Sequence, residues 1–161
     1  MYTSQYPFQF IACDIILTRY VDNNLEILLV TRGGEPYKGM LALPGGFLNE
    51  GELIEDCAKR ELFEETNIDS ISPYFVSFAD KVNRDPRQRT ISAVYAYHFD
   101  GDTPTNMKAG DDAADAQWYK VKDIEDGKLT LAFDHYDILS DYFIVLSDDG
   151  EVNENDITIG I

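Results

Sequence analysis

The sequence has few cysteines, few basic residues and no long apolar run, and each shortage excludes a class of protein. Its only two cysteines, Cys13 and Cys57, lie within apolar segments, so a disulfide framework is not expected. No apolar stretch approaches the roughly 20 residues that a membrane-spanning helix needs. The first residues lack the basic start and apolar centre of a signal peptide, so we expect a cytoplasmic protein with no membrane partner.

Positive charge is scarce, because 13 Lys and Arg residues stand against 30 Asp and Glu residues and the formal net charge is −17. Non-specific nucleic-acid binding needs clustered Lys and Arg contacts to phosphate, so we expect no nucleic-acid partner. A small phosphorylated ligand stays compatible with this charge if local cations line its pocket. The remaining acid, such as that of residues 148–151, is interpreted as solvated surface.

The pattern of apolar runs predicts one domain over residues 1–161, with neither a repeat nor a linker. Residues 22–24 supply a turn between the first two strands, residues 44–46 should end the third, and Asp134 should cap the second helix. Strands are expected at Phe8–Leu17, Leu25–Val30, Leu41–Leu43, Tyr74–Ala79, Thr90–Phe99 and Ala116–Tyr119, and helices at Glu52–Thr66 and Asp134–Leu146. This order predicts an α/β fold, with a mixed β-sheet sandwiched between α-helices.

The first expected helix carries acidic residues within its apolar face. At 100° per residue, Glu61 and Glu65 fall within about 20° of Ile54, and Glu64 lies at the edge of that face. Phe63 falls on the opposite side. The apolar face is expected to consist of Leu53, Ile54, Cys57, Ala58 and Leu62.

Buried carboxylates are costly unless a cation meets them. Arg60 stands at i,i+4 spacing from Asp56 and Glu64, but one arginine cannot neutralise the whole group. A hard divalent cation such as Mg²⁺ or Mn²⁺ could do so. From the helix alone, a solvated acidic patch or neutralisation by lysines elsewhere remains an equal alternative.

A longer spacing pattern surrounds this helix. From Gly46 the chain has five residues, Glu52, seven residues, and then Arg60-Glu61-Leu62-Phe63-Glu64-Glu65-Thr66-Asn67-Ile68. This segment closely resembles the Nudix box, and only the last glycine of the box differs, being Asn67 here. Asparagine tolerates the left-handed conformation that ends many helices, so the backbone role is expected to be kept. The resemblance implies the Nudix fold and metal-dependent cleavage of a diphosphate.

The resemblance also implies roles for the matching residues. Glu61 and Glu65 would be the principal metal ligands, Glu64 would assist or bind a further ion, and Glu52 would orient the helix and loop together with Arg60. The cofactor would be Mg²⁺, for which Mn²⁺ can substitute. The expected catalytic set is Glu52, Arg60, Glu61, Glu64 and Glu65, and a backbone carbonyl of Gly45 or Gly46 would complete the coordination.

Segments outside the box narrow the range of expected substrates. Residues 85–92 and 131–135 resemble segments of the ADP-ribose pyrophosphatase branch, which implies hydrolysis of ADP-ribose to AMP and ribose 5-phosphate. The alternatives are another nucleoside diphosphate derivative (a nucleotide sugar, dinucleoside polyphosphate or dinucleotide) and a non-catalytic ligand sensor. The nearly intact box and a chain that ends at Ile161, without the DNA-binding winged helix of related regulators, favour catalysis. Related hydrolases are commonly dimers, so a homodimer is expected.

Candidate substrate contacts come from a cationic loop that contains Arg84, Arg87 and Arg89. Arginine can contact phosphate bidentately or stack on a base, although a solvated strand connector would also carry such charges. Arg32 is a further phosphate candidate or a surface residue, and Phe47 is a stacking candidate or a core residue. Tyr37 and Phe133 have the same two interpretations as Phe47.

Three further polar residues have weaker functional interpretations. Asp111 and Asp112 lie where Nudix relatives often place a water-activating carboxylate, but they also suit a solvated acidic turn. His135 is expected to pack or form a local hydrogen bond rather than to act as a base.

Overall fold

A hairpin begins the fold in the computed structural model, which describes residues 5–101, 103–104 and 113–148. Strands β1 (Phe10–Val21) and β2 (Asn24–Arg32) are antiparallel, with Thr18 paired to Ile27. Asp22 and Asn23 both take positive φ, 48° and 60°, which gives the turn a twist that suits a hairpin. The predicted hairpin is confirmed, and its first strand extends to the turn rather than ending at Leu17.

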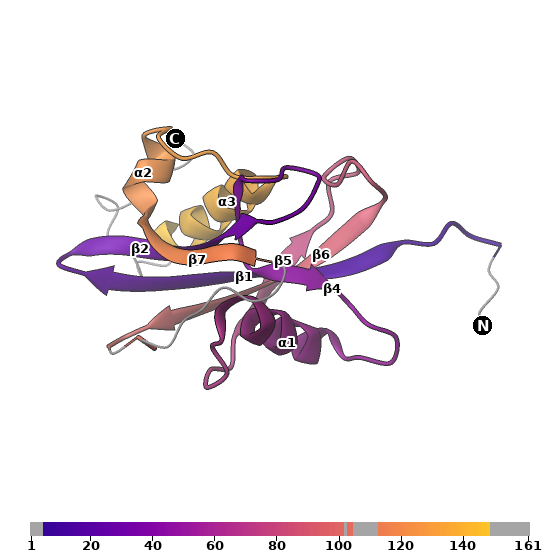
Figure 1. Ribbon diagram of the computed structural model, residues 1–161, viewed down its shortest axis with the longest axis horizontal. Coiled ribbons are helices and arrows are strands. Elements are labelled where there is room, and N and C mark those ends of the chain that lie inside the picture. The colour runs from indigo at the N-terminus through magenta and orange to yellow at the C-terminus, as the bar shows by residue number, and fades with distance from the viewer. Residues whose placement is uncertain (1–4, 102, 105–112, 149–161) are drawn as a thin grey trace.

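The sheet is mixed, as expected, and β1 lies within it (Figure 1). One side of β1 pairs in parallel with β6, and β5 then pairs antiparallel with β6 at the sheet edge. On the other side, β2 pairs antiparallel with β3 and β7. The remaining strands are β3 (Leu41–Ala42), β4 (Gly45–Phe47), β5 (Tyr74–Ala79), β6 (Thr90–Phe99) and β7 (Ala113–Lys120).

Strand β4 corrects the expectation that residues 44–46 only end a strand. Gly45 and Gly46 resume extended structure because they pair with Asp14 and Cys13 of β1. Away from the hairpin turn, therefore, β4 lies along β1 while β3 lies along β2. This divergence of the two central strands leaves the space that the candidate site occupies.

Helices cover both faces of the sheet, which confirms the predicted sandwich (Figure 1). Helix α1 (Ile54–Thr66) packs on one face with Ile15 and Leu17, while α3 (His135–Asp148) packs on the other with Ile16. The short helix α2 (Val121–Glu125), which the sequence pattern did not predict, joins the α3 side through Val121 and Ile124. Successive residues of β1 alternate between the two cores, as side chains of a strand covered on both faces must.

The ends of the two predicted helices differ in detail. Helix α1 begins at Ile54 rather than Glu52, and Leu53 is 70% exposed, so its assignment to the apolar face was wrong. At the other end Asn67 adopts φ 61°, ψ 24°, the left-handed conformation expected of the residue that replaces glycine. Asp134 precedes α3 as predicted, but both of its carboxylate oxygens bond Arg84 instead of capping the helix with its side chain.

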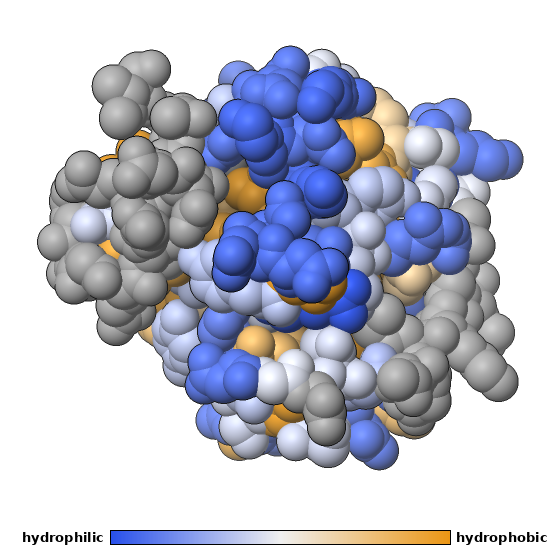
Figure 2. Space-filling model, turned by 90° about the vertical axis from the view of Figure 1, so that its left-hand side faces the viewer, coloured by the Kyte–Doolittle hydropathy of each residue, from blue (hydrophilic) through white to orange (hydrophobic). Residues whose placement is uncertain are grey.

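The candidate site lies away from the end of the sheet that carries the β1–β2 turn. Figure 2 shows the end near the β1–β2 turn, where most of the coloured surface is hydrophilic. The cavity of the candidate site is lined by the first half of β1 and the last residues of β2, away from this turn.

No helix in the part of the chain that the structure describes is long and apolar enough to cross a membrane.

Candidate active site

A cavity of about 770 Å³ opens where β1 and β2 diverge. Carboxylates of α1 line it together with cationic and aromatic side chains from the ends of β2 and β4, the loop between β5 and β6 and the segment before α3. Its polar and aromatic lining includes Asp14, Arg32, Phe47, Arg60, Glu61, Glu64, Glu65, Arg84, Asp85, Arg87, Phe133 and His135. Four of the five predicted substrate contacts are therefore in its wall, and Arg89 is the exception.

The carboxylates of Glu61 and Glu65 approach the backbone of β4. The Gly45 N–H donates to Glu65 Oε2 at 2.9 Å. A β-carbon at Gly46 would lie 2.4 Å from Glu61 Oε2, and one at Gly45 would lie 2.0 Å from the Cys13 carbonyl oxygen. Glycine at position 45 therefore lets β4 lie against the backbone of β1, and glycine at position 46 leaves room for the Glu61 carboxylate.

Burial without sufficient positive charge characterises this acidic pair. Burial raises the pKa of Glu65 to about 8, to which the charges of Glu61 and Asp14 contribute, while the Gly45 N–H opposes the rise. Burial also raises the pKa of Glu61, although Arg60 opposes it. A cation nearby would favour the charged form of both partly buried carboxylates, so the pair is suited to bind one.

Arg60 connects α1 to the loop that precedes it. Its guanidinium bonds Glu52 through Nε at 2.7 Å and Nη2 at 2.9 Å, and its Nη2 also donates to the Phe47 carbonyl at 3.0 Å. Through Nη1 it reaches Glu61 at 2.6 Å and Glu64 at 3.2 Å. This geometry suits the supporting role expected of Glu52 and Arg60.

Two carboxylates of α1 lie outside this inner group. Asp56, the other predicted partner of Arg60, is an exposed residue, and the ion pairs of Arg60 are with Glu52, Glu61 and Glu64. The Glu64 side chain is 55% exposed, compared with 13% for Glu61. Glu64 therefore lies at the rim of the cavity, where it can reach a ligand without being buried.

The donor set suits a divalent metal that also binds substrate. Among the described residues, no three Asp, Glu, His or Cys side chains form a group that could hold an ion by themselves. Mg²⁺ is characteristically bound by one or two carboxylates together with water and substrate phosphates, which matches Glu61 and Glu65. The Gly46 carbonyl oxygen lies 4.0 Å from Cys57 Sγ, on the α1 side of β4, where it could contribute as a further oxygen ligand.

Cationic and aromatic side chains form another part of the wall. The guanidinium carbon of Arg32 lies 4.6 Å from the centre of the Phe133 ring, and that of Arg87 lies 5.8 Å from the same ring. Arg87 also lies 5.4 Å from the Phe47 ring centre. Asp85 fixes Arg87 through two hydrogen bonds of 3.0 and 2.8 Å. These guanidinium groups are thus placed beside aromatic rings and supply positive charge to the cavity.

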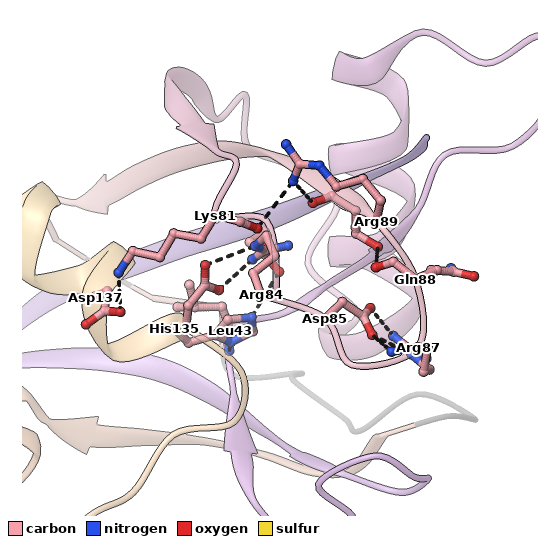
Figure 3. Close-up of polar contacts among 12 residues, drawn as sticks. Leu43, Lys81, Arg84, Asp85, Arg87, Gln88, Arg89, His135 and Asp137 are labelled. Atoms are coloured by element: carbon pink, nitrogen blue, oxygen red, sulfur yellow. Dashed lines mark hydrogen bonds and ion pairs between the residues drawn. The ribbon is translucent and has the colours of Figure 1, made fainter. Parts of the chain in front are cut away.

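Arg84 has a different environment from Arg87, as Figure 3 shows. Its Nη2 donates to Asp14 at 3.0 Å and to Asp134 at 2.8 Å, and its Nε donates to Asp134 at 3.0 Å. The Arg84 side chain is only 5% exposed. Arg89 donates to the main-chain carbonyls of Lys81 and Thr90. The loop therefore uses Arg84 and Arg89 for internal contacts, while Arg87 retains access to the cavity.

His135 completes the buried polar group around Asp14. Its Nδ1 accepts the Leu43 N–H at 2.9 Å, so the proton of this ring is on Nε2, which faces Asp14 Oδ1 at 3.4 Å. The ring is buried and packs beside Phe133, as one of the two expectations had it, but its hydrogen bond spans 92 positions and is not local. Burial would raise the pKa of Asp14, but His135 and Arg84 hold it well below its ordinary range.

Asp14 was missed by the sequence interpretation although a signal was present. It is an acidic residue in the otherwise apolar stretch Ile11–Leu17 of β1, and it is 7% exposed. A charge at the centre of a buried strand needs a partner, so its position alone could have indicated a polar site. The candidate water-activating residues Asp111 and Asp112 lie outside the described residues.

Gly46→Ala is expected to lower turnover by about 10²-fold with little change in Tm, because the new methyl group displaces a flexible carboxylate rather than backbone. The displaced group is that of Glu61, 2.4 Å from the added carbon. Steady-state kinetics and thermal unfolding would measure the two effects. Gly101→Ala is the matched control, since its β-carbon would meet nothing within 4 Å. Full turnover in Gly46→Ala would contradict the placement of Glu61 at the reacting group.

Known proteins resemble both the sequence and this geometry. The NUDIX domain model matches residues 12–142. An ADP-ribose pyrophosphatase of Methanocaldococcus jannaschii is 36% identical over 122 residues, which cover 76% of this chain and 68% of that protein. The ADPR responsive transcriptional repressor NtrR of Acinetobacter baylyi is 34% identical over 152 residues, which cover 89% of this chain and 57% of the repressor.

A solved structure agrees in fold. The NUDIX domain of Shewanella oneidensis NrtR, crystallised with ADP ribose, superposes with a TM-score of 0.78 at 26% identity, and the match covers 88% of this chain and 90% of that domain. The family match extends over most of the chain and includes the strands and the helix that build the cavity. The chain therefore belongs to the NUDIX domain family, and we classify it as a Nudix hydrolase acting on a pyrophosphate bond.

Proposed function

We propose that this chain is a Mg²⁺-dependent pyrophosphohydrolase that converts ADP-ribose to AMP and ribose 5-phosphate. The observation that carries the proposal is one cavity lined both by the buried carboxylates Glu61 and Glu65 and by the guanidinium groups of Arg32 and Arg87. Carboxylates recruit a cation and arginines bind phosphate oxygens, so a diphosphate is the group that satisfies both.

The carboxylates and the arginines of the cavity have separate roles in this proposal. Glu61 and Glu65, with Glu64 at the rim, would hold a divalent metal, which would supply charge neutralisation at phosphorus and acidification of water. Arg32 and Arg87 hold the diphosphate oxygens, and Arg60 keeps the carboxylates in place. No covalent enzyme intermediate is required.

The choice of ADP-ribose is supported by two relatives. The pyrophosphatase of M. jannaschii is named for this substrate, and the NrtR domain was crystallised with it. Another nucleoside diphosphate derivative would use the same carboxylates and arginines, and it is the first alternative.

A ligand sensor is the second alternative, and the similarity to the ADPR responsive repressor favours it. We prefer catalysis because sensing needs no buried acidic pair. Burial of Glu61 and Glu65 costs free energy, as their raised pKa values indicate. A bound metal would offset this cost.

The proposal extends to the assembly and the location of the protein. We propose a homodimer, with which the outward-facing and 47% exposed Phe63 is compatible. A cytoplasmic location and the absence of a nucleic-acid partner stay predictions from the sequence.

A hydrolysis screen tests the function. With Mg²⁺ present, ADP-ribose is expected to give the highest kcat/KM among ADP-ribose, nucleotide sugars, dinucleoside polyphosphates and nucleoside triphosphates. Chelation of the metal by EDTA should abolish the reaction, and Mn²⁺ should restore it. A clear preference for another compound would exclude ADP-ribose as the substrate. Tight binding of ADP-ribose without hydrolysis of any compound would establish the sensor instead.

A further inference from the structure

A second and smaller cavity, of about 400 Å³, adjoins the first. Phe133 and Arg84 line both cavities. The other walls come from Tyr37, from residues 81–83 of the loop between β5 and β6, and from Asp134 and Asp137 at the start of α3. A ligand whose diphosphate lies in the first cavity can therefore extend past Phe133 into the second.

We propose that this second cavity is a subsite for the adenine ring of the substrate, an inference that rests on the proposed function. The charges around the second cavity favour a neutral occupant. Lys81 pairs with Asp137 at 2.6 Å, and Arg84 is bonded to Asp134 (Figure 3). The ionic groups of the second cavity thus neutralise one another, whereas the first cavity holds the carboxylates of Glu61 and Glu65 and the guanidinium groups of Arg32 and Arg87. A neutral ring fits the second cavity better than a phosphate does.

Shape and surface chemistry favour a flat aromatic group. The rings of Tyr37 and Phe133 meet edge to face, with centroids 4.8 Å apart. Both residues hold positive φ, 64° and 54°, a conformation that is costly for side chains of this size. Val82 is 70% exposed beside them. Exposed aromatic and aliphatic carbon around a neutral cavity suits stacking by a base, not the hydroxyl groups of a ribose.

Asn83 supplies the polar specificity. Its side chain is exposed at the cavity wall and forms no hydrogen bond with any described residue. An Asn amide offers one acceptor and one donor group, which complement the N6 amino group and a ring nitrogen of adenine. The base edge that faces Asn83 is then the one that carries N7, where adenine presents a donor and an acceptor but guanine presents two acceptors, N7 and O6, and cannot use this pair. The subsite therefore predicts a preference for adenine.

Binding of mononucleotides tests the subsite without any reaction. Isothermal titration of the metal-free protein is expected to show AMP binding at least about tenfold tighter than GMP. Asn83→Ala should weaken AMP binding about tenfold and leave GMP and ribose 5-phosphate unchanged. Tyr37→Leu should weaken AMP by a similar factor through lost stacking. Phe63→Leu is the control, because it removes an exposed aromatic ring from the outer face of α1.

The outcomes separate the subsite from the proposed function. Unchanged AMP affinity in both variants, with ADP-ribose still hydrolysed, would overturn the subsite alone. Weaker ribose 5-phosphate binding with unchanged AMP binding would overturn it too, since the cavity would then hold the sugar. The expected AMP pattern in a protein that hydrolyses nothing would support the subsite and refute the hydrolase. A Tm within the range of the control shows that each variant is folded.

Discussion

Glu65→Gln is expected to reduce kcat for Mg²⁺-dependent hydrolysis by about 10³-fold or more, while the protein stays folded. The substitution removes a metal-binding charge that contributes several kcal/mol to the stabilisation of negative charge at phosphorus. It preserves the shape of the side chain, and the amide oxygen can still accept the Gly45 N–H that now bonds Glu65 Oε2 at 2.9 Å. Because a neutral group replaces a buried carboxylate, Tm in the absence of metal should be unchanged or higher.

Glu64→Gln is the matched control on the same helix. Its side chain is 55% exposed and bonds Arg60 at 3.2 Å, so it lies at the rim of the cavity. We expect a smaller loss, of about tenfold, because the buried Glu61 and Glu65 remain. Kinetics at saturating Mg²⁺ and thermal unfolding with EDTA measure the two effects. Equal losses in both variants, or undiminished turnover in Glu65→Gln, would refute the assignment of Glu65 as a principal ligand.

The acidic helix was the part of the site most accessible from sequence. The spacing of Glu61 and Glu65 against Cys57, Ala58 and Leu62 follows from helix geometry alone, and those three apolar residues are buried as predicted. A helical face depends on residues that are near in sequence, so the period of its apolar residues can be recognised without knowledge of the rest of the fold.

The strand that faces this helix was not accessible in the same way. Gly45 and Gly46 were expected to break a strand, yet they form β4 because β1 pairs with them across more than 30 residues. Local propensity favours a turn at such glycines, and long-range pairing overrides it. Their approach to Glu61 and Glu65 was implied only by the resemblance to the Nudix box, because local propensity does not contain a tertiary contact.

The arginines of the cationic loop show the same limit more sharply. Arg84, Arg87 and Arg89 looked equivalent in sequence, since all three lie in the same polar stretch. Only the fold distinguishes them, because Asp14 lies 70 positions from Arg84 and Asp134 lies 50 positions away. The role of a charged side chain depends on its partner, and here the partners are too far away in sequence for local spacing patterns to identify them.

Arg84→Met is expected to cause a large loss of stability. The substitution leaves Asp14 and Asp134, both near 10% exposed, without the guanidinium that bridges them. Removing one partner of a buried ion pair costs about 3–5 kcal/mol. For a chain of this size that corresponds to a fall in Tm of roughly 6–20 °C. Lys81→Met is the control, because the Lys81–Asp137 pair is 64% and 51% exposed and should contribute less than about 1 kcal/mol.

A double variant separates the buried charge from lost packing. If uncompensated carboxylate causes the instability, Asp134→Asn should destabilise the Arg84→Met background much less than it destabilises the native chain. Additive losses would contradict this cause and indicate that Arg84 contributes through packing alone. The cluster joins β1, the loop that carries Arg87 and the start of α3, all of which line the cavity. Arg84→Met should therefore also raise KM at a temperature where it is folded, which separates a residue that positions the site from one that only stabilises the fold.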